Sequence, residues 1–140
     1  MSRVFWDSNL FVYLLEDFGR LSEQAMNLRK SMLRRGDELV TSTVTLGEVL
    51  VHPNRNNRPD IASAYEQEIR QAALLIPFDI EAARIFAAIR CDKTIKAPDA
   101  IQLACAAQVR CDLFITNDDR LSGKIVPGIQ FVTSLQRAPI

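Results

Sequence analysis

Hydrophobic and polar positions follow two different patterns along the chain, and the changes between them predict its elements. Short apolar runs that end in polar or turn-forming residues are typical of buried strands. Such runs predict strands at Arg3–Trp6, Glu38–Ser42, Leu74–Phe78 and Leu113–Thr116, with a last one near Gln130–Thr133.

The longer segments between these runs carry apolar residues at helical spacing. The clearest case is Leu21, Ala25, Leu28 and Met32, which recur at i, i+4 and i+7 and predict an amphipathic helix that ends at Gly36. The notable signals elsewhere are a cap at Asp79 and prolines at helix starts. They predict further helices at Leu10–Phe18, at Thr45–Val51 with its end at His52-Pro53, from Pro59 onward, from Asp79 towards Arg90, and at Pro98–Arg110.

Strands that alternate with helices indicate an α/β fold, in which a parallel sheet has helices on both faces. A length of 140 residues with 48% hydrophobic content suits one domain, residues 1–140, with a substantial core. The sequence contains no internal repeat, low-complexity tract or linker.

The charge balance argues against a broadly basic surface. Lys+Arg and Asp+Glu both total 17, so the formal net charge is zero and the electrostatic signature of a nucleic-acid binder is absent from the chain as a whole. Nucleic-acid binding would therefore depend on local patches. Arg55 and Arg58 flank an Asn-rich loop, and Arg90, Lys93 and Lys96 precede a later helix; each cluster alone is also typical of a solvated face.

Particular residues argue against several kinds of structural or catalytic site, and the sequence pattern argues against a membrane or secreted location. Cys91, Cys105 and Cys111 are odd in number and lack paired spacing, which argues against a disulfide framework or zinc module and for a reducing compartment. A histidine-based catalytic arrangement would have to use His52, the only histidine. No apolar stretch could span a bilayer, and a secretory signal pattern is missing, so we expect a soluble cytoplasmic protein.

Four acids carry the candidate chemistry. Asp7 and Asp118 each follow a predicted strand, whereas Glu48 and Asp99 are expected in the first turns of helices that follow strands. All four positions belong to one edge of a parallel sheet, the edge at which binding sites are built. Because gathered carboxylates repel one another, oxygen ligation of a hard divalent cation is the usual resolution. The placement predicts an Mg²⁺ or Mn²⁺ site.

Each acid also has a purely structural explanation. Glu48 and Thr45 match a capping box, and Asp99 in a first turn complements the helix dipole. Asp7 and Asp118 are also typical turn formers. For any one acid alone the structural explanation is favoured, and it is their joint placement that points to a shared site.

Four stretches, in their order and spacing, resemble PIN domains, and among these the toxin ribonucleases of VapBC-type toxin–antitoxin pairs. The resemblance covers essentially the whole chain. The stretches are Val4-Phe5-Trp6-Asp7-Ser8-Asn9, the segment Thr41 to Leu50 around Glu48, Pro98-Asp99-Ala100-Ile101-Gln102-Leu103-Ala104-Cys105-Ala106, and Asp112-Leu113-Phe114-Ile115-Thr116-Asn117-Asp118-Asp119-Arg120-Leu121.

The resemblance implies a PIN-like α/β/α sandwich around a central, mostly parallel sheet of four to five strands. It implies a divalent-metal-dependent endoribonuclease whose catalytic, metal-binding acids are Asp7, Glu48, Asp99 and Asp118. Asn9 and Thr116 are then expected to hold the acids, with Asp119 as a neighbour. The implied partners are RNA, a cognate antitoxin, and a second copy in a homodimer. From their position just before Asp99, we expect Arg90, Lys93 and Lys96 to contact the RNA.

Three alternatives remain open at this point. A catalytically silent PIN-fold module would bind RNA or protein without cleavage, but it would not need several mutually repelling carboxylates. A DNA-cleaving relative would use the same metal chemistry. A receiver-like phosphoacceptor domain is disfavoured because Asn117-Asp118 stands where that class has a lysine.

Overall fold

The computed structural model describes residues 1–140 as alternating strands and helices. The strands are β1 (Arg3–Trp6), β2 (Glu38–Ser42), β3 (Leu74–Ile76), β4 (Leu113–Thr116) and β5 (Phe131–Ser134). The helices are α1 (Ser8–Leu15), α2 (Arg20–Arg35), α3 (Thr43–Arg55), α4 (Pro59–Ala72), α5 (Ile80–Ile89), α6 (Ala97–Gln108) and the short 3-10 helix η1 (Leu135–Arg137).

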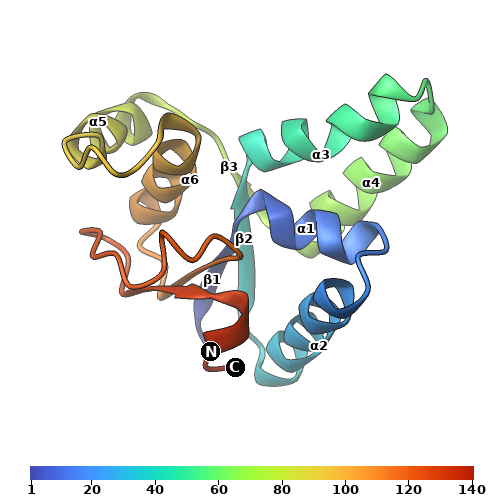
Figure 1. Ribbon diagram of the computed structural model, residues 1–140, viewed down its shortest axis with the longest axis horizontal. Coiled ribbons are helices and arrows are strands. Elements are labelled where there is room, and N and C mark those ends of the chain that lie inside the picture. The colour runs from blue at the N-terminus through green and yellow to red at the C-terminus, as the bar shows by residue number, and fades with distance from the viewer.

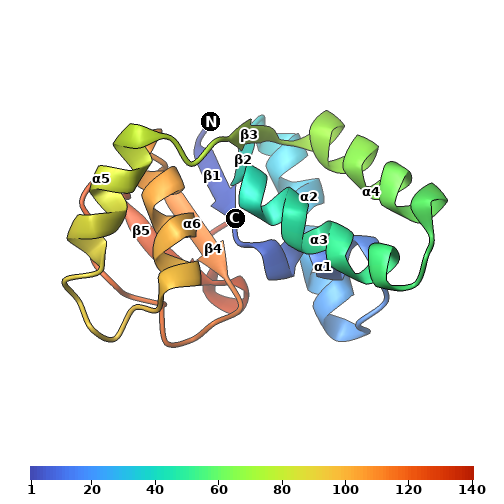
Figure 2. The same cartoon turned by 90° about the horizontal axis from the view of Figure 1, so that it is seen from above.

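The five strands form one sheet in the order β3-β2-β1-β4-β5, and every neighbouring pair is parallel. Helices α1 to α4 lie on one face of the sheet, and α5 and α6 lie on the other (Figures 1 and 2). The expected α/β/α sandwich is thus confirmed. The carboxyl ends of all five strands consequently point to one edge of the sheet.

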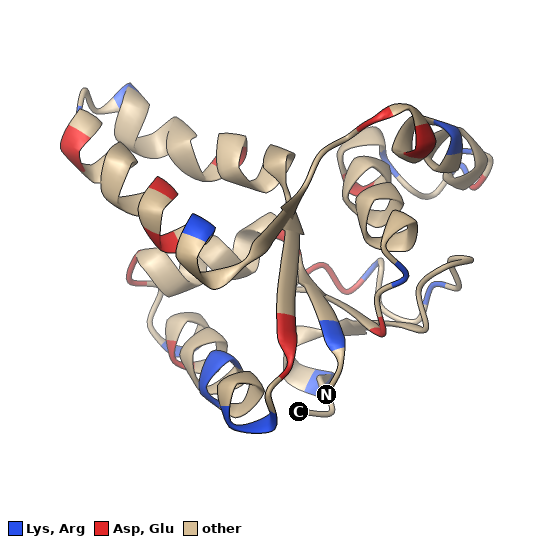
Figure 3. Ribbon diagram, turned by 180° about the vertical axis from the view of Figure 1, so that it is seen from behind, with Lys and Arg blue, Asp and Glu red and all other residues tan.

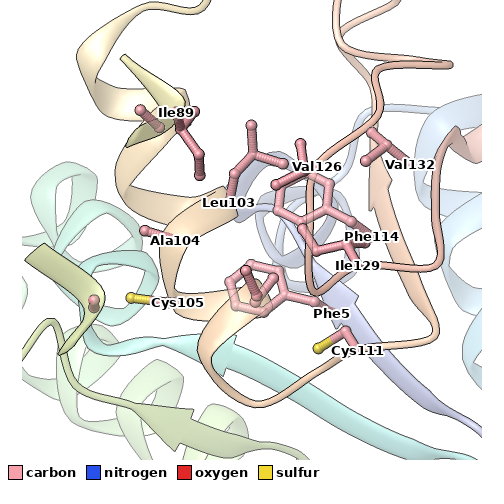
Figure 4. Packing of buried hydrophobic residues seen from close by; sticks show 14 of the residues in the cluster. Phe5, Ile89, Leu103, Ala104, Cys105, Cys111, Phe114, Val126, Ile129 and Val132 are labelled. Atoms are coloured by element: carbon pink, nitrogen blue, oxygen red, sulfur yellow. The ribbon is translucent and has the colours of Figure 1, made fainter. Parts of the chain in front are cut away.

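Alternation along the central strands creates a separate core on each face. In β1, Val4 and Trp6 pack towards α1 to α4, whereas Phe5 packs towards α5 and α6. Phe5 stacks on Phe114 of β4 with ring centroids 5.1 Å apart, and Leu103 of α6 lies beside them (Figure 4). Each fully buried side chain of this size contributes roughly 1.5–3 kcal/mol. These contacts hold β1, the strand before Asp7, rigidly in the middle of the sheet.

The apolar face of helix α2 packs into the hydrophobic core. Ala25, Leu28 and Met32 are buried and Leu21 is partly buried, so packing inside the domain, not a docking groove, accounts for them. Gly36 ends the helix with φ 74°, the left-handed conformation that favours glycine, as predicted.

The boundaries predicted for the first helix and for the end of α3 were wrong. The first helix is Ser8–Leu15 and not Leu10–Phe18, because Asp7 already caps it. The predicted stop at His52-Pro53 is not a stop, since α3 runs on to Arg55. Proline removes only one helical N–H, and the N–H of Arg58 donates to the Pro53 carbonyl (2.9 Å), which closes the helix end.

The expected buried strand at Leu74–Phe78 is shorter and more exposed than predicted. It covers Leu74–Ile76, and the Leu74 side chain is 51% exposed while Ile76 is buried. The reason is topological: β3 is an edge strand, so within the apolar run Ile76 is buried, Leu75 is only partly buried against the core and Leu74 is exposed. None of the helices combines the length and apolar character needed to cross a membrane.

Candidate active site

Asp7 is the most buried of the four acids. It follows β1 directly, caps α1 and is only 7% exposed. The Thr116 hydroxyl of β4 donates to its Oδ2 (2.8 Å), and the Ser8 N–H donates to its Oδ1 (2.8 Å). Both carboxylate oxygens are therefore oriented, one by the end of β4 and the other by the start of α1.

The electrostatic environment of Asp7 lacks a positive partner. Burial raises the pKa of its carboxyl to about 6, against the lowering effect of the hydrogen bonds from Thr116 and Ser8. The negative charges of Asp99 and Glu48 raise that pKa further. A buried carboxylate in this state is stabilised by any cation that reaches it.

Glu48 approaches Asp7 from α3. The Ser8 hydroxyl donates to its Oε2 (2.8 Å), which places Glu48 beside the start of α1. The predicted first-turn position was wrong, because α3 begins at Thr43. The capping-box explanation is wrong as well: Ser42 is the cap, and its hydroxyl accepts from the Thr45 N–H (3.2 Å). Glu48 is therefore available for another role.

Asp99 and Asp118 form the other half of the cluster. Asp99 lies in the first turn of α6, as predicted, and burial followed by the nearby charge of Asp118 raises its pKa. Lys96 and Arg120 act in the opposite direction on Asp99. Asp118 follows β4 and pairs with Arg120 through two contacts of 3.0 and 2.8 Å, and this pairing lowers the pKa of Asp118.

The structure brings the acids to one edge of the sheet as a chain of neighbours. The negative charges of Glu48 and Asp99 both raise the pKa of Asp7, and the negative charge of Asp118 raises the pKa of Asp99. No three acidic, histidine or cysteine side chains converge closely enough, as they are placed, to hold one ion. The donor set nevertheless fits Mg²⁺ or Mn²⁺, because every candidate ligand is an oxygen and Asp7 has no counter-charge.

The three expected neighbours of the acids have different surroundings. Thr116 hydrogen-bonds Asp7, which is the contact that a positioning residue would make. Asn9 donates to none of the acids, and its Oδ1 is buried without a partner. Asp119 is exposed and makes no hydrogen bond or ion pair through its side chain.

The predicted RNA-contacting cations lie in the segment before α6. Lys96 is near enough to act on Asp99 and Asp118, and Lys93 is exposed. Arg90 is partly committed, since its Nη1 donates to the Ile95 carbonyl (2.8 Å). Lys and Arg are spread over several elements of the chain (Figure 3).

A buried polar network behind the acids was not foreseen from the sequence. Gln102, one turn after Asp99, donates to Thr45 of α3 (2.7 Å) and also pairs with Ser42. Thr41 lies 2.8 Å from Thr45 Oγ1 and 2.9 Å from the Trp6 carbonyl, which precedes Asp7. Because buried polar groups must be satisfied, this network sets the spacing between α3, α6 and β1. The available signal was a polar Gln inside the apolar run of α6.

The family model described as PIN domain matches residues 4–124. No curated protein sequence matches the chain significantly. The matched region includes all four acids, Thr116 and the buried network.

Solved structures of toxin–antitoxin complexes share the fold. A chain of VapBC2 from Rickettsia felis, bound to a DNA fragment from the promoter, is 12% identical with a TM-score of 0.75, covering 94% of this chain and 98% of that one. A toxin–antitoxin complex from Klebsiella pneumoniae is 24% identical (TM-score 0.65, 90% and 94% covered). DNA-bound VapBC from Salmonella typhimurium is 18% identical (TM-score 0.67, 96% and 99% covered).

Proposed function

The chain belongs to the PIN domain family, and from this premise we propose that it is a divalent-metal-dependent endoribonuclease, acting as the toxin of a toxin–antitoxin module. The observation that carries the proposal is Asp7, a buried carboxylate with both oxygens oriented and no counter-charge, beside two further acids. A purely structural cap does not need like charges around it.

Asp7 and Asp99 are the proposed central ligands, and Glu48 and Asp118 complete the set. Thr116 and Ser8 keep the Asp7 carboxylate in one orientation, while the Ser8 hydroxyl holds Glu48. A bound divalent cation supplies charge neutralisation at the phosphate oxygens and lowers the pKa of a water molecule.

The substrate must also be attracted to the acids and must be able to reach them, and these two tasks depend on the protein's cations and on how open the site is. A phosphodiester carries negative charge and would be repelled by the acids alone. Lys96 and Arg120 place positive charge beside Asp99 and Asp118. The exposed position of Glu48 leaves one side of the cluster open to a polymer.

The testing experiment incubates the purified protein with structured RNAs and with DNAs of matched sequence, in Mg²⁺, Mn²⁺ or EDTA. We expect cleavage of RNA that requires the metal. An identically purified Asp7→Asn protein controls for contaminating ribonucleases. Metal-dependent cleavage of DNA alone would favour the DNA-cleaving relative, and binding without cleavage would favour the catalytically silent module.

The toxin assignment implies protein partners. The fold neighbours are described as toxin–antitoxin complexes, which supports a cognate antitoxin for this chain. A hollow of about 300 Å³ between α1 and α4, lined by Phe11, Leu14, Leu15 and Ile69, offers apolar surface to such a partner. A homodimer and a cytoplasmic location belong to the same proposal, and light scattering of the purified protein measures the former.

His52→Ala and Cys105→Ala should each leave kcat/KM within about twofold of wild type, because the proposed chemistry needs neither a base nor a thiol nucleophile. His52 lies one helical turn after Glu48 on α3, and its ring pairs with Glu16 (2.8 Å) and not with any of the four acids. Cys105 is buried, and burial raises the pKa of its thiol to about 11. Steady-state kinetics on folded variants measures this, and a collapse in either would move the chemistry away from the acids.

Replacing Arg90, Lys93 and Lys96 together by Ala should weaken RNA binding more at low salt than at high salt. Cations that contact phosphate release counterions, so each loss flattens the dependence of log Kd on log salt by roughly 0.7 for a single strand. Fluorescence anisotropy in EDTA across a salt series measures the slope. A slope equal to wild type would show an ordinary solvated face.

A further inference from the structure

Asp118 is the only one of the four acids that an ion pair already holds. Arg120 Nε donates to Oδ1 (3.0 Å) and Nη2 donates to Oδ2 (2.8 Å), so the guanidinium occupies both carboxylate oxygens. The Arg120 N–H also donates to Oδ1 (3.0 Å). The Arg120 side chain is 66% exposed, whereas that of Asp118 is 21% exposed.

We propose that Arg120 alternates between two partners: it neutralises Asp118 while no metal ion is bound, and it binds a phosphate of the RNA backbone once Asp118 turns to the ion. This inference rests on the proposed function. It adds to the four acids a residue that controls their availability and contacts the substrate.

The first step follows from competition for one carboxylate. Asp118 cannot offer the same two oxygens to a guanidinium and to a cation, and the two positive charges repel one another. The existing pair is easily broken, because an exposed ion pair of this kind contributes little to stability. Removing the guanidinium should therefore strengthen metal binding by roughly two- to fivefold.

The second step follows from where the released side chain remains. Arg120 is two residues from Asp118, and its charge already acts on Asp99. Its side chain makes no hydrogen bond other than those to Asp118, so nothing else restrains it. A planar guanidinium binds phosphate through paired hydrogen bonds, a geometry that lysine lacks. Because the chain has zero net charge, a single guanidinium beside the acid cluster contributes a large share of the attraction between the site and the RNA phosphates.

The experiment compares Arg120→Gln with a matched control, Arg58→Gln. Arg58 holds Asp60 through the same two atoms (3.1 and 3.0 Å) at the same i, i+2 spacing, and both side chains are exposed. The Arg58–Asp60 pair includes none of the four acids. Isothermal calorimetry with Mn²⁺ alone measures the metal Kd, and cleavage of a fluorescent single-stranded RNA at saturating Mn²⁺ measures KM and kcat.

We expect Arg120→Gln to bind Mn²⁺ two- to fivefold more tightly and to show a KM about tenfold higher, whereas Arg58→Gln should bind Mn²⁺ as the wild type does. Arg120→Lys should restore part of the KM effect. A merely structural role would weaken both metal binding and substrate binding. Mn²⁺ affinity that is unchanged or weaker in Arg120→Gln overturns the competition step, and an unchanged KM overturns the phosphate contact.

The outcome separates this inference from the proposed function. A wild-type protein that binds no Mn²⁺ would overturn both together. A wild-type protein that binds Mn²⁺ and cleaves RNA, with an Arg120→Gln variant identical to it, would overturn only the role of Arg120.

Discussion

Asp7→Asn is expected to reduce kcat/KM for RNA cleavage by at least about a hundredfold, equivalent to ~2.7 kcal/mol of lost transition-state stabilisation. The amide has the shape of the carboxylate but lacks the charge that binds a cation. Its oxygen can accept from the Ser8 N–H, and its NH₂ group can donate to the Thr116 hydroxyl oxygen, so the local hydrogen bonds persist. Asp99→Asn should behave in the same way. Steady-state kinetics in Mg²⁺ and Mn²⁺ measures the loss.

Asp79→Asn is the matched control for this loss. Asp79 caps α5 as Asp7 caps α1, and its Oδ1 accepts from the Ala82 N–H (3.0 Å), but it lies outside the acid cluster. Its variant should retain full activity. If Asp7→Asn kept more than about a tenth of wild-type activity, less than ~1.4 kcal/mol would have been lost and Asp7 would be a cap and not a ligand.

The fold could be predicted from the sequence because the patterns that indicate its strands and helices involve only neighbouring residues. β1 and β4 are short continuous apolar runs that are buried on both faces of the sheet, and the apolar stripe of α2 follows the helical period. These patterns depend on neighbouring residues and on which face each element buries. The exposure of β3 was not accessible in this way, because its edge position is decided by strand order and not by its own residues.

The candidate site was accessible only in part, for a related physical reason. Asp7, Asp99 and Asp118 were placed correctly because each follows a strand or a proline that marks a boundary. The start of α3 was misplaced because Ser42, which ends β2, also caps the helix, so the strand passes directly into it. The pairing of Gln102 with Ser42 and Thr45 joins residues far apart in sequence, and no local pattern encodes such a contact.

The apo protein should become less stable as pH rises through the range in which Asp7 ionises, and Asp7→Asn should remove that loss. The folded-state pKa of Asp7 is raised from 3.8 to about 6, so the native state binds more protons than the unfolded state between these values. The penalty is therefore absent below pH 3.8 and fully present above about pH 7. It corresponds to about 3 kcal/mol, at 1.36 kcal/mol for each pH unit.

Urea denaturation in EDTA at pH 4.5 and at pH 8 measures this difference, with Asp7→Asn expected to be more stable than wild type by only about 1 kcal/mol at the lower pH and by about 3 kcal/mol at the higher pH. Asp79→Asn should shift in the opposite sense, because capping lowers the pKa of Asp79 and its charge stabilises the fold at high pH. Mn²⁺ at about a hundred times its Kd should then stabilise wild type by roughly 2.7 kcal/mol, nearly cancelling the advantage of Asp7→Asn. An Asp7→Asn protein that is less stable than wild type at pH 8 in EDTA would mean that the carboxylate stabilises the fold as a cap, and the idea of an electrostatically strained metal site would have to be abandoned.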